Sequence, residues 1–149
     1  MVTLMFIGAS PGGTGGGIKT TTFAVLLLTM RSTILGRYQT EIFERRIPHE
    51  IVRRAMTIVF LSLGLVLFTT AIVTMQGFSF GQVLFEATSA FGTVGLTMGI
   101  TPQLNVFSKL MIAITMFIGR VGTLTLFAGL TLASKDRRTG FPKEEVSIG

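Results

Sequence analysis

The sequence contains no cysteine, a single histidine and few charged residues, which make up only 13% of its 149 residues. Without cysteine there is no disulfide framework, no thiolate chemistry and no thiolate-held metal site. Soluble domains carry about 25% charged residues. With 48% hydrophobic residues and a mean hydropathy of +0.67, the chain suits lipid better than water. The scarcity of charge therefore predicts an integral membrane protein.

Two further absences limit the possible functions. The N-terminus has no charged n-region and no clear cleavage site, so we expect no signal peptide. It enters apolar sequence abruptly, and we expect the chain to be a fragment of something longer. His49 lies among acids and arginines, which is typical of a solvated side chain rather than a metal ligand. The net charge of +6 gathers in two patches instead of one binding face, so we expect no nucleic-acid partner. We also expect no enzymatic activity and no covalent cofactor.

A glycine-rich stretch, SPGGTGGGIKTTT at residues 10–22, has the composition of a phosphate-binding loop. Gly12 and Gly17 have the separation of a P-loop, but Ile18 stands between Gly17 and Lys19 and moves the lysine out of register. No strand-like alternation precedes the loop. A membrane-associated nucleotide-binding protein remains the alternative. The preferred interpretation is a flexible polar break within a helix, which membranes tolerate only where it lines a cavity or is buried in protein.

Three apolar stretches are candidates for membrane helices. Ala55–Met75 has 21 residues without a charge, enough at about 1.5 Å per residue to cross a hydrocarbon layer of roughly 30 Å. Leu110–Ala133 is similar but contains Arg120. Thr20–Met30 is too short to cross alone and would need residues 1–9, or residues upstream, to complete a crossing. The glycine-rich stretch would then lie in the middle of that crossing.

The connection between the two long stretches contains a short amphipathic segment, Phe78–Phe91, which suits a re-entrant helix. Residues 31–54 contain six arginines and residues 135–143 four lysines and arginines, whereas Gln76–Lys109 contains only Lys109. Excess positive charge marks the cytoplasmic side, so the connection is predicted to lie outside. The short helix ends in Gly92-Thr93-Val94-Gly95, where glycine opens extended backbone. A short helix followed by Thr-Val-Gly predicts a cation filter of backbone carbonyls, and an extracellular loop with an ordinary amphipathic helix is the alternative.

The stretches SAFGTVGLTMGIT, FIGRVGTLTL and FIGASPGGTGGGIKTTT together resemble the Trk/Ktr/HKT cation transporters, most closely the membrane subunit of Ktr potassium uptake systems. The resemblance implies an all-α membrane fold of four helix–pore helix–helix repeats, of which this chain holds the end of the third and the complete fourth. Residues 1–35 would be a broken transmembrane helix, 36–54 a cytoplasmic connector, 55–133 the fourth repeat and 134–149 a cytoplasmic tail.

The same resemblance assigns functional residues. A selectivity filter would bind K⁺ at the carbonyls of Thr93, Val94, Gly95 and Leu96. Because Leu96-Thr97 replaces the Tyr-Gly of potassium channels, this filter is expected to be less strictly selective. An intramembrane gate would consist of Gly12, Gly13, Thr14, Gly15, Gly16, Gly17, Lys19 and Arg120.

The resemblance also implies partners: the missing repeats of the same polypeptide, a second copy in a homodimer, a cytosolic ring of nucleotide-binding regulatory subunits and membrane lipids. K⁺ would be the transported ion, with Na⁺ as a coupling or activating ion. The expected location is a bacterial plasma membrane, crossed more than once.

Three charged residues within the apolar segments leave alternatives open. A charge at the bilayer centre costs roughly 2.5–3.5 kcal/mol on insertion scales, so Arg120 should face protein or water. Arg120 would hold the glycine loop through its carbonyls or would be tied to a neighbouring helix. Lys19 would extend towards the cytoplasm. Glu86 would either raise the local cation concentration or steady the filter through a hydrogen bond.

Overall fold

The computed structural model describes residues 1–10, 12–36, 41–42 and 45–122. These residues are mostly helical, which confirms the predicted helical class in outline. The elements in chain order are α1 (Val2–Phe6), α2 (Thr20–Ile34), β1 (Glu41–Ile42), β2 (Arg45–Arg46), α3 (His49–Thr74), α4 (Phe80–Gly92), a 3₁₀ turn (Thr101–Gln103) and α5 (Val106–Val121).

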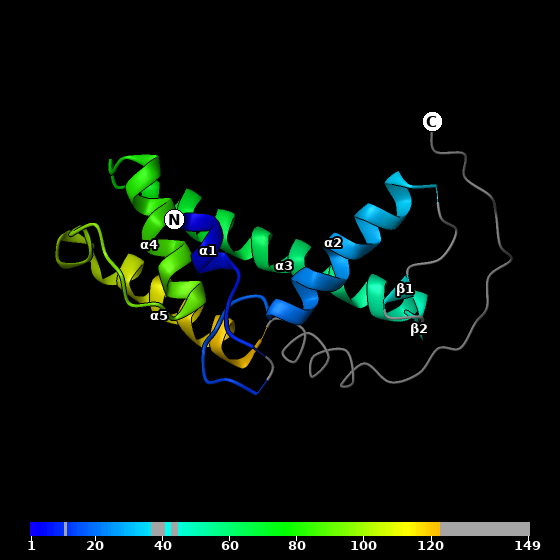
Figure 1. Cartoon of the computed structure of the whole chain (residues 1–149). Helices are drawn as coiled ribbons and strands as arrows, with labels where there is room; N and C mark the ends of the chain where they lie inside the picture. The colour runs from blue at the N-terminus through cyan, green and yellow to red at the C-terminus, as the bar shows by residue number, and fades with distance from the viewer. Residues whose placement is uncertain (11, 37–40, 43–44, 123–149) are drawn as a thin grey trace, which may run out of the picture.

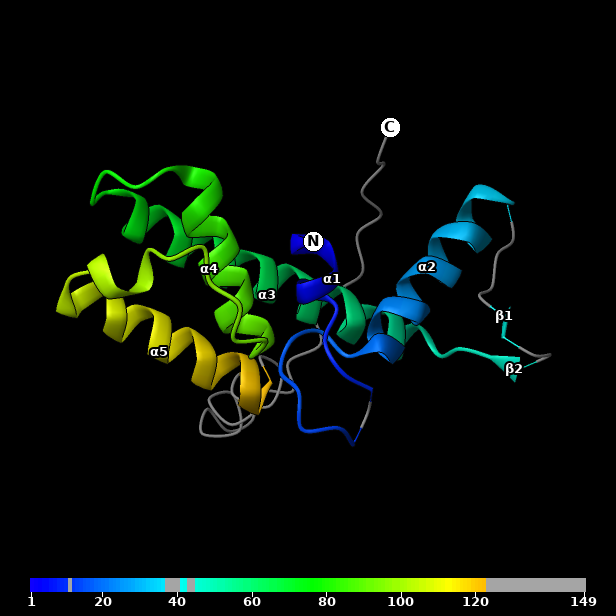
Figure 2. The same cartoon turned by 60° about the vertical axis from the view of Figure 1, so that its left-hand side comes forward.

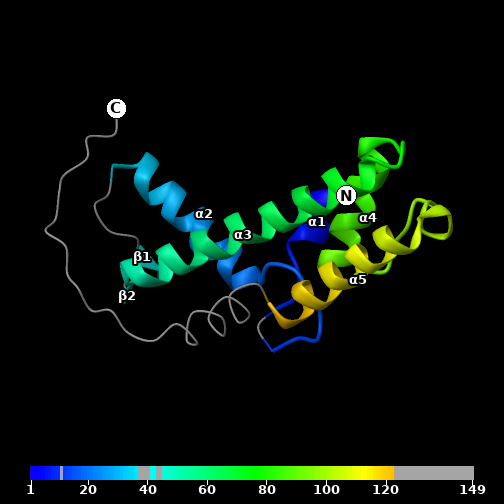
Figure 3. The same cartoon turned by 180° about the vertical axis from the view of Figure 1, so that it is seen from behind.

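Helix α3 extends along the molecule, with α4 and α5 against one end and α2 against the other (Figures 1 and 3). Its 26 residues begin at His49, earlier than the predicted start of the span at Ala55. Pro48 occupies the N-cap position and Glu50 lies in the first turn, where a negative charge suits the positive end of the helix dipole. Arg53 and Arg54 therefore belong to this helix, although the sequence placed them in the connector.

By length and composition, α3 is the one helix in the described part of the chain that could cross a membrane. Helix α5 is described only to Val121, followed by Gly122. The remainder of the predicted span, residues 123–133, and the predicted tail, 134–149, lie outside the described residues.

The segment between α2 and α3 contains a small departure from the all-helical expectation. Strands β1 and β2 pair antiparallel as a two-residue ladder, with Glu41 opposite Arg46 and Ile42 opposite Arg45. Residues 37–40 and 43–44 of the predicted connector lie outside the described residues.

Helix α4 is the centre of the packing and contacts α1, α3 and α5 (Figure 2). All seven residues from Glu86 to Gly92 are buried. One apolar cluster joins α4 to α3, to α5 and to the chain before α5, and it contains Val73, Val83, Ala90, Ile100, Leu104 and Ile112. A second cluster joins another side of α4 to the chain just before α2 and to α3, and it contains Ile18, Val66, Ala87 and Phe91. The C-terminal end of α4 is therefore held from several sides, which fixes the start of the segment that follows it.

Polar side chains add contacts between α3 and α5. Thr69 and Thr115 are fully buried, and their hydroxyl oxygens lie 2.8 Å apart. At the other end of this helix pair, the Gln76 amide donates to Asn105 Oδ1 at 3.0 Å and also to the Ser108 hydroxyl. These bonds join the C-terminal end of α3 to the N-terminal end of α5.

Candidate functional site

The end of α4 leads directly into the predicted filter residues. Thr93 has a φ of 53°, in the left-handed region, and its N–H donates to the Ala90 carbonyl at 3.1 Å. The Val94 N–H donates to the Ser89 carbonyl at 3.0 Å, which completes the cap of the helix. A β-branched residue in this region costs about 1–2 kcal/mol, so the surrounding packing must hold Thr93 there.

Beyond this cap the chain runs without helix or strand to the 3₁₀ turn at Thr101. Gly95 has a φ of 81°, a conformation that glycine adopts without steric cost. A Cβ on Gly95 would meet nothing within 4 Å, and residues 94–99 are exposed. The backbone of this segment is therefore accessible from outside the chain.

Glu86, on α4, is bonded to the far end of the same segment. Its carboxyl group is buried, and Oε1 accepts hydrogen bonds from the Thr97 hydroxyl and from the Met98 N–H, the latter at 3.1 Å. Oε2 accepts from the Thr101 hydroxyl at 3.1 Å. Of the two roles left open by the sequence, a hydrogen-bonding role matches these contacts, which reach the chain just after the predicted filter residues.

The glycine-rich loop is closed at its base by backbone hydrogen bonds. Ile7 and Ile18 form a parallel bridge, in which the Gly8 N–H donates to the Ile18 carbonyl at 2.7 Å and the Ile18 N–H donates to the Phe6 carbonyl at 3.1 Å. A short helix, α1, precedes the loop, where a P-loop would have a strand. Of the predicted gate residues within the loop, the exposed ones are Gly12, Gly13, Thr14 and Gly15.

The loop and the predicted filter meet at Gly16. This residue is buried, and its N–H donates to Thr93 Oγ1 at 2.8 Å. A Cβ on Gly16 would lie 2.8 Å from the Phe91 carbonyl oxygen and 3.1 Å from that of Gly119. Only a residue without a side chain fits this gap between α4 and α5. The structure thus brings together two predicted site residues that are 77 positions apart.

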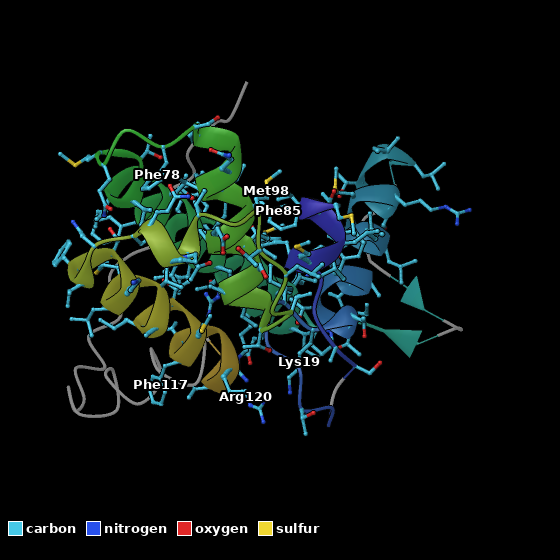
Figure 4. All side chains as sticks on the ribbon, turned by 90° about the vertical axis from the view of Figure 1, so that its left-hand side faces the viewer. Lys19, Phe78, Phe85, Met98, Phe117 and Arg120 are labelled. Carbon is cyan, nitrogen blue, oxygen red and sulfur yellow. The ribbon has the colours of Figure 1, made fainter. Side chains whose placement is uncertain are left out.

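The two cations of the predicted gate lie beside this junction. Lys19 is exposed at the N-cap position of α2, and Arg120 is exposed in the last turn of α5. Figure 4 shows both at the end of the molecule that carries the loop, with Phe78 at the opposite end. Gly119, next to Arg120, is the residue of α5 that packs against the carbonyl of Phe91.

Sequence reasoning named Gly92 only as the end of the short helix and did not name Gly119, so it missed the close backbone contacts of both. A Cβ on Gly119 would overlap the Phe91 carbonyl oxygen, and a Cβ on Gly92 would overlap the carbonyl oxygen of Met5. A glycine inside an apolar helical pattern is the signal that would have pointed to such close backbone contact.

Comparisons with known proteins agree with the sequence resemblance. Residues 1–136 match the TrkH family, described as cation transport protein. Ktr system potassium uptake protein B of Bacillus subtilis is 42% identical over 98% of this chain and 33% of its own length. Ktr system potassium uptake protein D of the same organism is 40% identical over the same shares. Potassium/sodium uptake protein NtpJ of Enterococcus hirae is 37% identical over 98% of this chain and 34% of its own length.

The chain spans about a third of the length of these relatives. The family match, by contrast, covers most of the chain, including both the glycine-rich loop and the segment after α4. The chain belongs to the TrkH family of cation transport proteins.

Proposed function

We propose that this chain is part of a membrane-embedded potassium uptake protein, in which the segment after α4 conducts K⁺ and the glycine-rich loop gates it. The observation that carries the proposal is the junction between the two: the Gly16 N–H bonded to Thr93 Oγ1 at 2.8 Å. A loop able to change shape lies directly against the first residue of the proposed filter. The potassium uptake activity named for the relatives gives the transported ion.

The proposed filter consists of the main-chain carbonyls of Thr93, Val94, Gly95 and Leu96. Helix α4 has 13 residues and is about 20 Å long, too short to cross a bilayer but suited to a re-entrant pore helix. Its C-terminal end carries a partial negative charge that favours a cation near Thr93. Carbonyl oxygens beyond it would replace the hydration shell of K⁺. Positive φ angles at Thr93 and Gly95 support a backbone with carbonyl directions unlike those of a regular strand.

The proposed gate is the loop from Gly12 to Gly17, with Lys19 and Arg120 beside it. Its exposed part can move at little steric cost, because most of it is glycine. A cation at Arg120 would repel K⁺ in the closed state and would hold loop carbonyls by hydrogen bonds. Lys19 would extend towards the cytoplasm.

In this proposal α2 ends the third repeat of a four-repeat pore, and α3, α4 and α5 belong to the fourth. Residues 1–35 would form the broken transmembrane helix, 36–54 the connector, 55–133 the repeat and 134–149 the tail, with connector and tail in the cytoplasm of a bacterial cell. The pore would be completed by further repeats and would work as a homodimer on a cytosolic nucleotide-binding ring, within membrane lipid. Na⁺ would act as a coupling or activating ion.

The test is the substitution Gly95→Ser in the complete transporter, reconstituted in liposomes and measured for K⁺ and Na⁺ flux. Gly77→Ser is the matched control, since Gly77 has a φ of 88°, also has open space at its Cβ, and lies outside the proposed filter. We expect Gly95→Ser alone to lower the K⁺/Na⁺ flux ratio. An unchanged ratio in assembled protein would refute the filter assignment, as would an equal change in both variants.

A further inference from the structure

Glu86 is the buried acidic residue on α4, with 5% of its surface exposed. Both of its oxygens are engaged by one short stretch of chain, Thr97 to Thr101. The contacts are with two hydroxyl groups and one backbone N–H, which are donors without formal charge. Among the residues that the structure describes, Glu86 is held by these neutral donors, and its burial requires the donors that the stretch supplies.

The hydrogen-bond pattern within the stretch is directional. Thr97 has one hydroxyl proton, which it donates to Glu86 Oε1, and its oxygen accepts from the Gly99 N–H at 2.9 Å. The Thr101 hydroxyl donates to Glu86 Oε2 at 3.1 Å. The Thr97 and Thr101 hydroxyl oxygens also lie 3.1 Å apart, and a carboxylate that accepts at both oxygens takes up the protons of both hydroxyl groups. The turn formed by Thr97 to Gly99 is thus folded onto α4 by one side chain.

We propose that Glu86 is a positioning residue that sets ion discrimination by holding the outer end of the proposed filter. This inference rests on the proposed function. The four filter residues are fixed at one end by the helix cap at Thr93 and at the other by Glu86 through Thr97 and Met98. These two attachments limit how far the ends of the backbone between them can move apart. Carbonyls held at fixed positions can distinguish ions of different size, whereas free carbonyls adjust to either ion.

A role in attracting cations from solution fits the structure less well. Attraction from solution needs a carboxylate that faces the aqueous mouth. Glu86 is buried, and both oxygens are engaged in hydrogen bonds. Removal of the side chain should therefore affect which ion passes more than how many ions arrive.

The experiment measures K⁺ and Na⁺ flux of the complete transporter in liposomes for four variants. Glu86→Ala removes every bond, and Thr101→Val removes the donor to Oε2 with little change in shape. Glu86→Gln keeps one acceptor oxygen, and its amide can donate to the Thr101 oxygen. Thr88→Val is the control, because Thr88 is equally buried on α4 but donates only to the Leu84 carbonyl of its own helix at 2.7 Å.

We expect Glu86→Ala to lower the K⁺/Na⁺ flux ratio roughly tenfold, the scale of losing one hydrogen bond to a charged group. Glu86→Gln should recover most of the ratio, Thr101→Val should fall between them, and Thr88→Val should match wild type. The combination Glu86→Gln with Thr101→Val should show a change that differs from the sum of the single effects, since the two residues share a bond.

Two results would overturn the inference. One is an unchanged ratio in assembled Glu86→Ala protein, and the other is an equal change in Glu86→Ala and Thr88→Val. If Gly95→Ser shifts the ratio in the same preparation, the proposed filter stands and only the role of Glu86 is wrong. If Gly95→Ser also leaves the ratio unchanged, the proposed function itself fails. Should Glu86→Ala not assemble, Thr101→Val decides, and a ratio equal to that of wild type or of Thr88→Val would overturn the inference.

Discussion

Gly119→Ala should separate α4 from α5 where the loop meets them. A Cβ at this position would overlap the carbonyl oxygen of Phe91 and would lie 2.9 Å from its carbonyl carbon. An ordinary carbon–oxygen contact is about 3.3 Å, so the two helices would have to move apart by roughly 1 Å. Because the obstacle is backbone, no change of rotamer can relieve it.

Two opposing effects decide the sign of the stability change. Alanine is favoured over glycine within a helix by about 0.8–1.0 kcal/mol. Overpacking in a well-packed interior costs typically 1–3 kcal/mol, and contact with backbone belongs at the upper end of that range. We therefore expect Gly119→Ala to lower the free energy of unfolding by about 1–2 kcal/mol, and to displace Gly16 from its place beside the carbonyl of Gly119.

The measurement is thermal denaturation of the purified complete transporter in detergent, together with K⁺ flux in liposomes. Gly64→Ala and Gly81→Ala are the matched controls, since both glycines lie in helices and have nothing within 4 Å of a built Cβ. Both controls should be as stable as wild type or more stable. If Gly119→Ala were stabilised as much as the controls, the close contact between α4 and α5 would be refuted.

Three further predictions concern contacts between distant segments. Thr69→Val should lower the free energy of unfolding by about 1–2 kcal/mol, and its combination with Thr115→Val should cost less than the sum in thermal denaturation; strictly additive costs would contradict the pairing. Thr93→Val, which removes the acceptor of the Gly16 N–H, should raise K⁺ leak through the closed state by up to roughly tenfold, while Thr93→Ser should not; equal leak in both would argue against the contact. Shortening Gly12–Gly17 should raise K⁺ flux in assembled protein, and a fall or no change would exclude the loop as a gate.

The helices could be predicted from the sequence more reliably than their ends. The uncharged run from Ala55 to Met75 identified α3, because lipid-compatible length is a property of composition alone. Its start at His49 was missed, because arginines on the first turns of a helix look like a polar connector when charge alone is read. The break at the glycine-rich loop was predicted from glycine content. The bridge between Ile7 and Ile18 could not be predicted, because it depends on how the chain before the loop packs beside the chain after it.

Contacts within the candidate site depend on packing between distant parts of the chain. Periodicity placed Glu86 and Thr93 on or after one short helix, but it gave no reason to choose between two roles for Glu86. Its bonds to Thr97 and Thr101 arise because the chain turns back over α4. The Gly16–Thr93 bond spans 77 positions and has no local signature. The family resemblance implied that the glycine-rich loop and the segment after α4 lie near one pore. The structure adds the two atoms through which these segments meet.

The strength of these contacts bears on which part moves in the proposed gate. One backbone hydrogen bond, from Gly16, links the loop to Thr93, and its net worth is about 0.5–1.5 kcal/mol. Gly16, which is buried beside the Phe91 carbonyl, adds no apolar side chain to that attachment. Helix α4, by contrast, is held by two apolar clusters and by the bonds of Glu86. The part of the loop from Gly12 to Gly16 can therefore leave the junction at a small fraction of the free energy needed to shift α4, while Ile18 at the base of the loop stays packed in the second cluster. Gating by this loop would then open the path while the geometry that selects the ion stays unchanged.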